Sequence, residues 1–109
     1  MSVSEERVTQ ALKYLVETDE SCARAKALMK GLDGQTKSIE AIEFLKTKGL
    51  GAQGEREKMA RASQNYRNHI NLCTDAIFDY ELVNNKRNTE AMVIEVFRSL
   101  NANRRKGNI

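Results

Sequence analysis

The chain has 109 residues, of which 40% are hydrophobic and 30% charged, and it contains neither Trp nor Pro. No apolar run approaches the ~20 residues that a membrane-spanning helix needs, and the acidic, polar start MSVSEERVTQ does not fit a secretory signal. The formal net charge of +3 is too small to indicate nucleic-acid binding by itself. This composition favours one small, well-solvated helical domain.

The first predicted helix covers residues 4–48. Ser2 and Glu5 fit a capping box at its start, because each side chain can reach the other's backbone amide. Gly31 and Gly34 interrupt the helical pattern, and each costs roughly 1 kcal/mol relative to alanine. Because the apolar row resumes close to its earlier phase, we favour one continuous helix, with a kink allowed at the glycines. The alternative is a break there and a three-helix domain. The apolar row is Val8, Leu12, Leu15, Cys22, Ala25, Met29 and Leu32.

A sharp reversal of the chain is predicted at residues 49–54. This segment, GLGAQG, holds three of the six glycines. Lysines precede it and glutamates follow it, as expected for the end of one helix and the start of another. Gly49 can take the left-handed conformation that ends a helix, and Gly54 can act as the N-cap of the next.

The second predicted helix covers residues 55–106. Met59, Tyr66, Cys73 and Tyr80 recur every seven residues, which is the spacing of a coiled-coil seam. The polar run at residues 84–89 competes for backbone hydrogen bonds, so we expect a kink or a new cap near Asn88. The residues that flank the seam are Ile70 and Ile77 on one side, and Ala62, His69, Ala76 and Val83 on the other.

Together these elements predict an all-α fold, a long antiparallel, coiled-coil-like helical hairpin formed by one single domain over residues 1–109. If the turn centres near Gly51, the numbers of paired residues add to about 103, because both arms rise by the same ~1.5 Å per residue. Acidic residues before Ser21 would then lie opposite Lys86 and Arg87. Gly34 would lie opposite His69, where the missing side chain would make room for the ring.

A second apolar strip on each arm indicates that the hairpin assembles further. Two helices alone bury little apolar surface, so we expect a homo-oligomer, most simply a dimer that forms a four-helix bundle. The alternative is that these apolar residues are ordinary surface positions. The strips are Val16, Leu28 and Phe44 on the first arm, and Leu72, Phe78 and Leu82 on the second; Phe78, Leu82 and Leu72 are the candidate interface residues.

The sequence contains no set of residues typical of a catalytic site, a metal site or a phosphate-binding loop. His69 is the only histidine, and with Cys73 alone beside it on the helix it cannot complete a metal site. The glycines do not have the spacing of a phosphate-binding loop, and the Glu-x-x-His motif of di-iron bundles is absent. We therefore expect no enzyme activity, no cofactor, no metal and no small-molecule substrate. We read His69 as a packing residue and Cys22 and Cys73 as small apolar residues without an intrachain disulfide.

The C-terminal end carries an excess of basic residues. From Lys86 onward there are six Lys or Arg residues against two Glu. One explanation is a solvated helix end whose cations compensate the helix dipole. The other is contact with nucleic-acid phosphates or with a partner. The candidate contact residues are Arg98, Asn101, Arg104, Arg105 and Lys106.

This C-terminal stretch also carries a resemblance to known proteins. The segment RSLNANRR at residues 98–105, followed by Gly107 and preceded by Lys86-Arg87, is similar to the tail of small helical proteins encoded in bacteriophages and prophages. The resemblance implies a phage-type setting near recombination or replication genes, and the cytoplasm of a bacterial host. It implies no catalytic residue.

Two hypotheses about function follow. The first is an accessory protein that acts near phage DNA recombination or replication, through nucleic acid or a nucleic-acid-binding protein. The second is a helical protein–protein interaction module, structural or inhibitory towards a host factor, without nucleic-acid contact.

Overall fold

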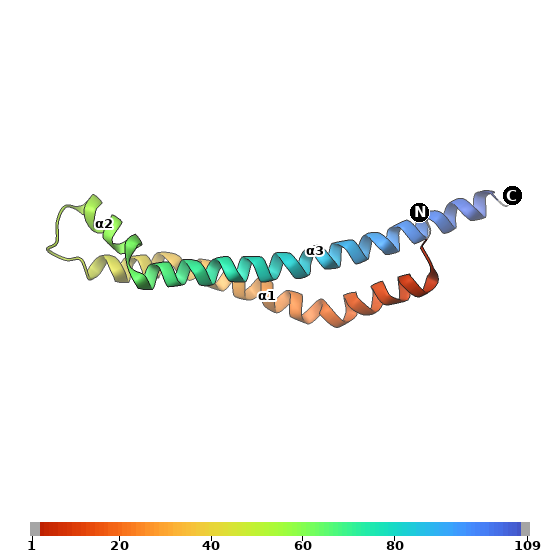
Figure 1. Ribbon diagram of the computed structural model, residues 1–109, viewed down its shortest axis with the longest axis horizontal. Helices are drawn as coiled ribbons and strands as arrows, with labels where there is room; N and C mark the ends of the chain where they lie inside the picture. The colour runs from red at the N-terminus through yellow and green to blue at the C-terminus, as the bar shows by residue number, and fades with distance from the viewer. Residues whose placement is uncertain (1–2, 108–109) are drawn as a thin grey trace. The chain divides into compact units, whose positions relative to one another are not determined.

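The computed structural model describes residues 3–107, and this part of the chain is helical almost throughout (Figure 1). The helices are α1 (Glu5–Leu45), α2 (Gln53–Ala62) and α3 (Gln64–Gly107), and no strand occurs among the described residues. The predicted all-α helical hairpin is therefore confirmed. By internal contacts the chain divides into two compact units: unit 1 combines Met1–Ala23 with Glu81–Ile109, and unit 2 is Arg24–Tyr80. Each unit is described separately.

Helix α1 begins at Glu5, where Ser4 acts as its N-cap. The Ser4 Oγ atom accepts a hydrogen bond from the backbone N–H of Arg7 at 3.1 Å, which satisfies one of the amides that a helix start leaves unpaired. The capping box expected at Ser2 falls outside the described residues. From Glu5 the helix continues without interruption to Leu45. The continuous first arm is therefore confirmed, although it ends three residues earlier than predicted.

The two glycines inside α1 do not make room for a neighbouring side chain, as the predicted register had suggested. A Cβ atom placed on Gly31 or on Gly34 would have no contact within 4 Å. His69 instead contacts Thr36, at 2.9 Å between its Nε2 atom and the Thr36 Oγ1 atom. Gly31 and Gly34 are both exposed, so they contribute backbone freedom without a packing benefit.

The reversal lies between the end of α1 and the start of α2, at residues 46–52, and so begins earlier than the predicted 49–54. Gly49 has the positive φ that was expected of it, at +81°. Gly54 lies inside α2, whose N-cap is Ala52, so the predicted N-cap at Gly54 is wrong. At this end the backbone N–H groups of Thr47 and Lys48 donate to the carbonyl oxygens three residues back, at 3.0 and 3.3 Å, and the Thr47 hydroxyl also donates to the Phe44 carbonyl oxygen at 2.6 Å, so the last turn is tighter than an α-helix.

Arg56 fixes the turn from the α2 side. Its Nε atom donates to Thr47 Oγ1 at 3.0 Å, and one terminal nitrogen donates to the Phe44 carbonyl oxygen at 3.4 Å. The guanidinium carbon also lies 4.1 Å from the centre of the Phe44 ring, within the range of a cation–π contact. Phe44 is therefore partly covered by Arg56, rather than available for the second apolar strip in which the sequence placed it.

The second arm is not one helix, because Ser63 separates α2 from α3. Ser63 has extended dihedral angles, φ −63° and ψ 151°. Its hydroxyl donates to the Ala60 carbonyl oxygen at 2.7 Å and accepts from the Tyr66 N–H at 3.2 Å. One side chain thus ends α2 and caps α3. The new cap predicted as one alternative near Asn88 is wrong, since α3 runs through the polar stretch at residues 84–89 without interruption; the kink, the other alternative, stays a prediction.

In unit 2, the seam between the arms follows the predicted seven-residue pattern along α3, whereas Met59 and Ala62 of α2, which the pattern also included, are exposed. His69 and Ala76 are buried, and Tyr66, Cys73 and Tyr80 are half-buried, as expected of residues on one face of α3. Arg61 contacts Glu40 at 2.9 Å across the two arms, close to the predicted register. The flanking residues Ile70 and Ile77 are exposed.

In unit 1, polar contacts at two levels hold the arms together. Arg7 and Glu90 form a two-pronged ion pair, with nitrogen–oxygen distances of 2.7 and 2.9 Å. Arg87 donates to the Leu15 carbonyl oxygen and to the Thr18 hydroxyl, both at 2.7 Å, and lies 3.3 Å from an Asp19 carboxylate oxygen. The predicted contact between the acidic stretch and Arg87 is therefore confirmed for Asp19.

The apolar core of unit 1 differs from the prediction by one residue. Ala11 is fully buried, whereas Leu12, which the apolar row had placed in the seam, is 51% exposed. Arg7, Ala11 and Thr18 share one face of α1, because they are separated by four and seven residues. Since Arg7 and Thr18 both bond to α3, that face is turned inwards and Leu12 is turned away.

Candidate functional site

A groove between the two arms of unit 2 is the first candidate site. We call it the two-arm groove. Its volume is about 370 Å³. Ile42 from α1 and Leu72 from α3 are about half exposed, at 52% and 55%. The lining residues are Leu32, Gln35, Ile39, Ile42, Glu43 and Lys46 from α1, and Asn65, Asn68, His69 and Leu72 from α3.

The predicted interface residues do not form one surface. Leu72 and Phe78 are six positions apart along α3, so at about 100° per residue their side chains leave the helix about 120° apart. Leu72 lines the two-arm groove with Ile39 and Ile42 from the opposite arm. Phe78 is 63% exposed and Leu82 46% exposed, and neither lines this groove. The strip of Leu72, Phe78 and Leu82 is therefore separated into a groove residue and two residues outside the groove.

The rim of the two-arm groove is polar, and its charges are already paired. Glu43 is 6% exposed, and its carboxylate lies 2.6 Å from the Lys46 ammonium group and 3.5 Å from the Asn65 amide nitrogen. The hydrogen bond from Lys46 lowers the pKa of Glu43, with further contributions from Ser63 and Asn65. A ligand in this groove would therefore meet apolar side chains and amides, with no unpaired charge on Glu43.

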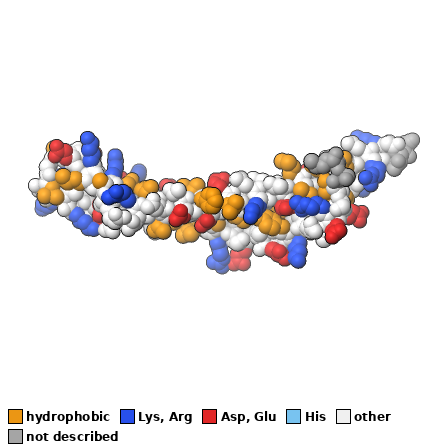
Figure 2. All heavy atoms as spheres, viewed as in Figure 1, with side chains coloured by type: hydrophobic (Ala, Val, Ile, Leu, Met, Phe, Trp, Pro, Cys, Tyr) orange, Lys and Arg blue, Asp and Glu red, His pale blue; other side chains and the backbone are white. Residues whose placement is uncertain are grey.

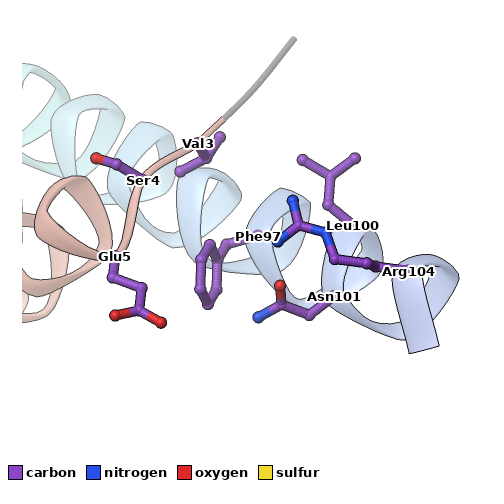
Figure 3. A pocket seen from close by; sticks show the side chains of 7 residues that line it. All are labelled: Val3, Ser4, Glu5, Phe97, Leu100, Asn101 and Arg104. Atoms are coloured by element: carbon purple, nitrogen blue, oxygen red, sulfur yellow. The ribbon is translucent and has the colours of Figure 1, made fainter. Parts of the chain in front are cut away.

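A second hollow, the terminal hollow, lies in unit 1 between the start of the described chain and the C-terminal part of α3 (Figure 3). Its volume is about 380 Å³. Figure 3 shows Asn101 and Arg104 extending from α3 beside the Phe97 ring, with Glu5 on the opposite side. It is lined by Val3, Ser4, Glu5, Phe97, Leu100, Asn101 and Arg104. Glu5 from the acidic start and Arg104 from the basic end therefore line the same hollow.

The predicted contact residues of the basic end are only partly brought together. Asn101 and Arg104 line the terminal hollow, whereas Arg98, Arg105 and Lys106 do not. Arg98 lies 3.3 Å from Glu95 on the same helix. Arg104, Arg105 and Lys106 are exposed in the last turn of α3, and no ion pair or hydrogen bond of their side chains occurs within residues 3–107.

His69 occupies a packed, hydrogen-bonded position, as the sequence suggested. It is 5% exposed, and its Nε2 atom contacts Thr36 Oγ1 at 2.9 Å and Cys73 Sγ at 3.4 Å. Cys22 and Cys73 are both free thiols and half-buried. No group of three or more metal-binding side chains occurs among the residues that the structure describes.

Sequence reasoning missed three residues that shape unit 2: Thr36, Arg56 and Ser63. Arg56 and Thr36 act across the arms, so no local pattern indicates them. Ser63 had a usable signal, because serine followed by polar residues is typical of a helix N-cap. The seven-residue spacing continues from Met59 to Tyr66 across Ser63, and it favoured one uninterrupted helix over a cap at Ser63.

The chain was compared with known protein families, with curated proteins and with solved structures. None of the three comparisons found a match. None of the described helices is long and apolar enough to cross a membrane.

Proposed function

We propose that this protein is a helical protein-binding module and that a second copy of the chain occupies the two-arm groove. The observation that carries the proposal is the lack of a closed apolar core. Among the described residues the buried apolar side chains are Ala11, Ala60 and Ala76, and no large side chain is fully buried. Within residues 3–107, thirteen large apolar residues are exposed, and in Figure 2 apolar side chains of unit 2 reach the surface on the face in view.

The accessible surface area of the chain supports a large interface with a second copy. The chain exposes 8272 Å², whereas a folded monomer of 12.3 kDa is expected to expose about 6,100 Å². The excess of about 2,200 Å² is comparable to what one partner contributes to a large permanent homodimer interface. A second copy is favoured over an unrelated partner because the chain supplies both a groove between two helices and helices that fit such a groove. The small net charge of +3 opposes self-association only weakly.

Leu72 and Phe78 provide a matched pair of variants to test this proposal. Both lie on α3 in unit 2 and both are more than half exposed, but only Leu72 lines the groove. We expect the wild-type chain to be a dimer by light scattering at micromolar concentration. Leu72→Asp should dissociate it, because the groove would bury an unpaired carboxylate. Phe78→Asp should leave the dimer intact.

Two results would overturn the use of the groove by a second copy. A wild-type mass near 12 kDa would show that the chain does not pair with itself. A dimer that survives Leu72→Asp but dissociates with Phe78→Asp would place the interface at Phe78 and Leu82. Helix content measured by circular dichroism separates dissociation from unfolding in both variants.

We also propose a second function, contact of the C-terminal end of α3 with nucleic-acid phosphates. The observation that favours it is the absence of a described partner for Arg104, Arg105 and Lys106. Mobility shifts on single- and double-stranded DNA at low and moderate salt test it. If these residues bind phosphates, Arg105→Ala should weaken binding and reduce the slope of log K against log salt by about one. Arg98→Ala, at a residue already paired with Glu95, is the control.

The biological setting is part of the same proposal. The resemblance of residues 98–105 to phage-encoded helical proteins supports a phage-type role near DNA recombination or replication, in the bacterial cytoplasm. Failure of all DNA to shift at low salt would remove the direct nucleic-acid contact and would leave the protein-binding module. A pull-down from bacterial lysate then tests whether a nucleic-acid-binding protein is the partner.

A further inference from the structure

The seam of unit 2 contains a compact polar cluster of Thr36, His69 and Cys73, which we call the Thr–His–Cys cluster. The His69 Nε2 atom lies 2.9 Å from Thr36 Oγ1 and 3.4 Å from Cys73 Sγ. The two outer atoms, Thr36 Oγ1 and Cys73 Sγ, are 4.0 Å apart. The hydroxyl and the thiol therefore both contact the Nε2 atom of His69. Depending on the tautomer, this nitrogen either donates one hydrogen or accepts one hydrogen bond.

The position of the thiol beside the imidazole is set by both arms. His69 and Cys73 are four residues apart on α3, so their side chains lie on the same face one turn apart. Thr36 reaches them from α1, and His69 is only 5% exposed. The ring is therefore held in place next to the sulfur atom, which is the arrangement in which an imidazole can take the proton of a thiol.

Cys73 borders a small hollow. Cys73 is half-buried, and it lines a space of about 230 Å³ together with Met29, Lys30, Asp33 and Ile77. Small molecules of the size of one half of an aromatic disulfide can enter a space of this volume. Cys22 is half-buried as well, but no hydrogen bond of its thiol occurs among the described residues. Cys22 can therefore serve as the reference thiol with which the reactivity of Cys73 is compared.

We propose that Cys73 is a modification site for low-molecular-weight disulfides, with His69 as the group that accepts the thiol proton. The proton of the Cys73 S–H group moves to His69 Nε2, and the sulfur attacks one sulfur atom of the disulfide. The disulfide bond breaks as a bond forms between Cys73 Sγ and the attacked sulfur. The departing thiolate takes a proton from His69 or from water. The incoming disulfide is the oxidant, so the step needs no further reagent. This role goes beyond the proposed function.

The test compares the two thiols in single-cysteine variants of the full chain. Cys22→Ser retains Cys73, and Cys73→Ser retains Cys22. The probe is 2,2′-dipyridyl disulfide, which carries no charge at neutral pH and therefore does not respond to Lys30 or Asp33. Release of 2-thiopyridone, followed by its absorbance at pH 7, gives the rate for each thiol. We expect Cys73 to react at least roughly tenfold faster than Cys22.

A second pair of variants, in the Cys22→Ser background, tests the role of His69. His69→Gln should lower the rate at Cys73 to that of Cys22, because glutamine cannot accept the proton. Unfolding would also separate the thiol from the ring and lower the rate, so helix content measured by circular dichroism must stay at the wild-type value in this variant. Thr36→Val should raise the rate, since it removes the hydroxyl that competes for Nε2. Equal rates for the two cysteines in the folded chain, or no fall with His69→Gln, would overturn the proposal. A fall in rate with Thr36→Val would do so as well.

Discussion

Replacing Gly31 or Gly34 by alanine should stabilise the protein. Both glycines lie in the interior of α1, where glycine has more conformational freedom to lose on folding than alanine. A Cβ atom at either position has no contact within 4 Å, so the substitution adds no steric cost. Each substitution should therefore raise the free energy of unfolding by the full difference in helix propensity between glycine and alanine, about 1 kcal/mol.

The two substitutions should add almost completely, because neither new methyl group touches another side chain. The double variant should gain about 2 kcal/mol. For a chain of this length, 1 kcal/mol corresponds to about 4 °C in Tm, so the single and double variants should melt about 4 and 8 °C above wild type. Thermal unfolding is followed by circular dichroism at one protein concentration, since the Tm of an assembling protein depends on concentration.

Gly49→Ala is the control for this experiment. Gly49 has a φ of +81°, which costs an L-residue roughly 1–2 kcal/mol, so its Tm should fall. A lower Tm for Gly31→Ala or Gly34→Ala would refute the reasoning. It would mean that another chain packs against the backbone of α1 at these positions, where only a hydrogen atom would fit.

Three further predictions concern the turn and the helix break of unit 2. Glu43 has a folded-state pKa below its unfolded value, so its contribution to stability is present above about pH 4.3 and is lost as the pH falls through the folded-state pKa. Glu43→Gln should remove this part of the acid dependence in unfolding titrations. Arg56→Ala should lower the free energy of unfolding by about 1–2 kcal/mol, through loss of the Phe44 ring contact and two hydrogen bonds; an unchanged urea midpoint would contradict this. Ser63→Ala should cost about 1 kcal/mol by removing the cap of α3, whereas Ser63→Asn, which can also cap, should restore most of it.

The amino-acid sequence by itself determined the features that depend on a few neighbouring residues. The seven-residue spacing of Tyr66, Cys73 and Tyr80 specified the buried face of α3, because helix periodicity is a local property. The glycines of the turn specified the reversal, because Gly49 tolerates the positive φ found there. The basic last turn of α3 was equally visible in the sequence. The sequence therefore predicts the helical hairpin, and it predicts α3 residues of the two-arm groove and of the terminal hollow.

Only the tertiary structure decided the features that join residues from both arms. Leu72 was recognised as an exposed apolar residue, but its grouping with Ile39 and Ile42 depends on how the arms are rotated about their axes. The rotation of the arms in unit 2 also brings Thr36 to the His69 ring. In unit 1, Ala11 is buried instead of Leu12, because the ion pair and hydrogen bonds to α3 turn that face of α1 inwards. Rotation is set by the sum of many weak contacts between residues distant in sequence, and the spacing of residues along one arm does not contain that information.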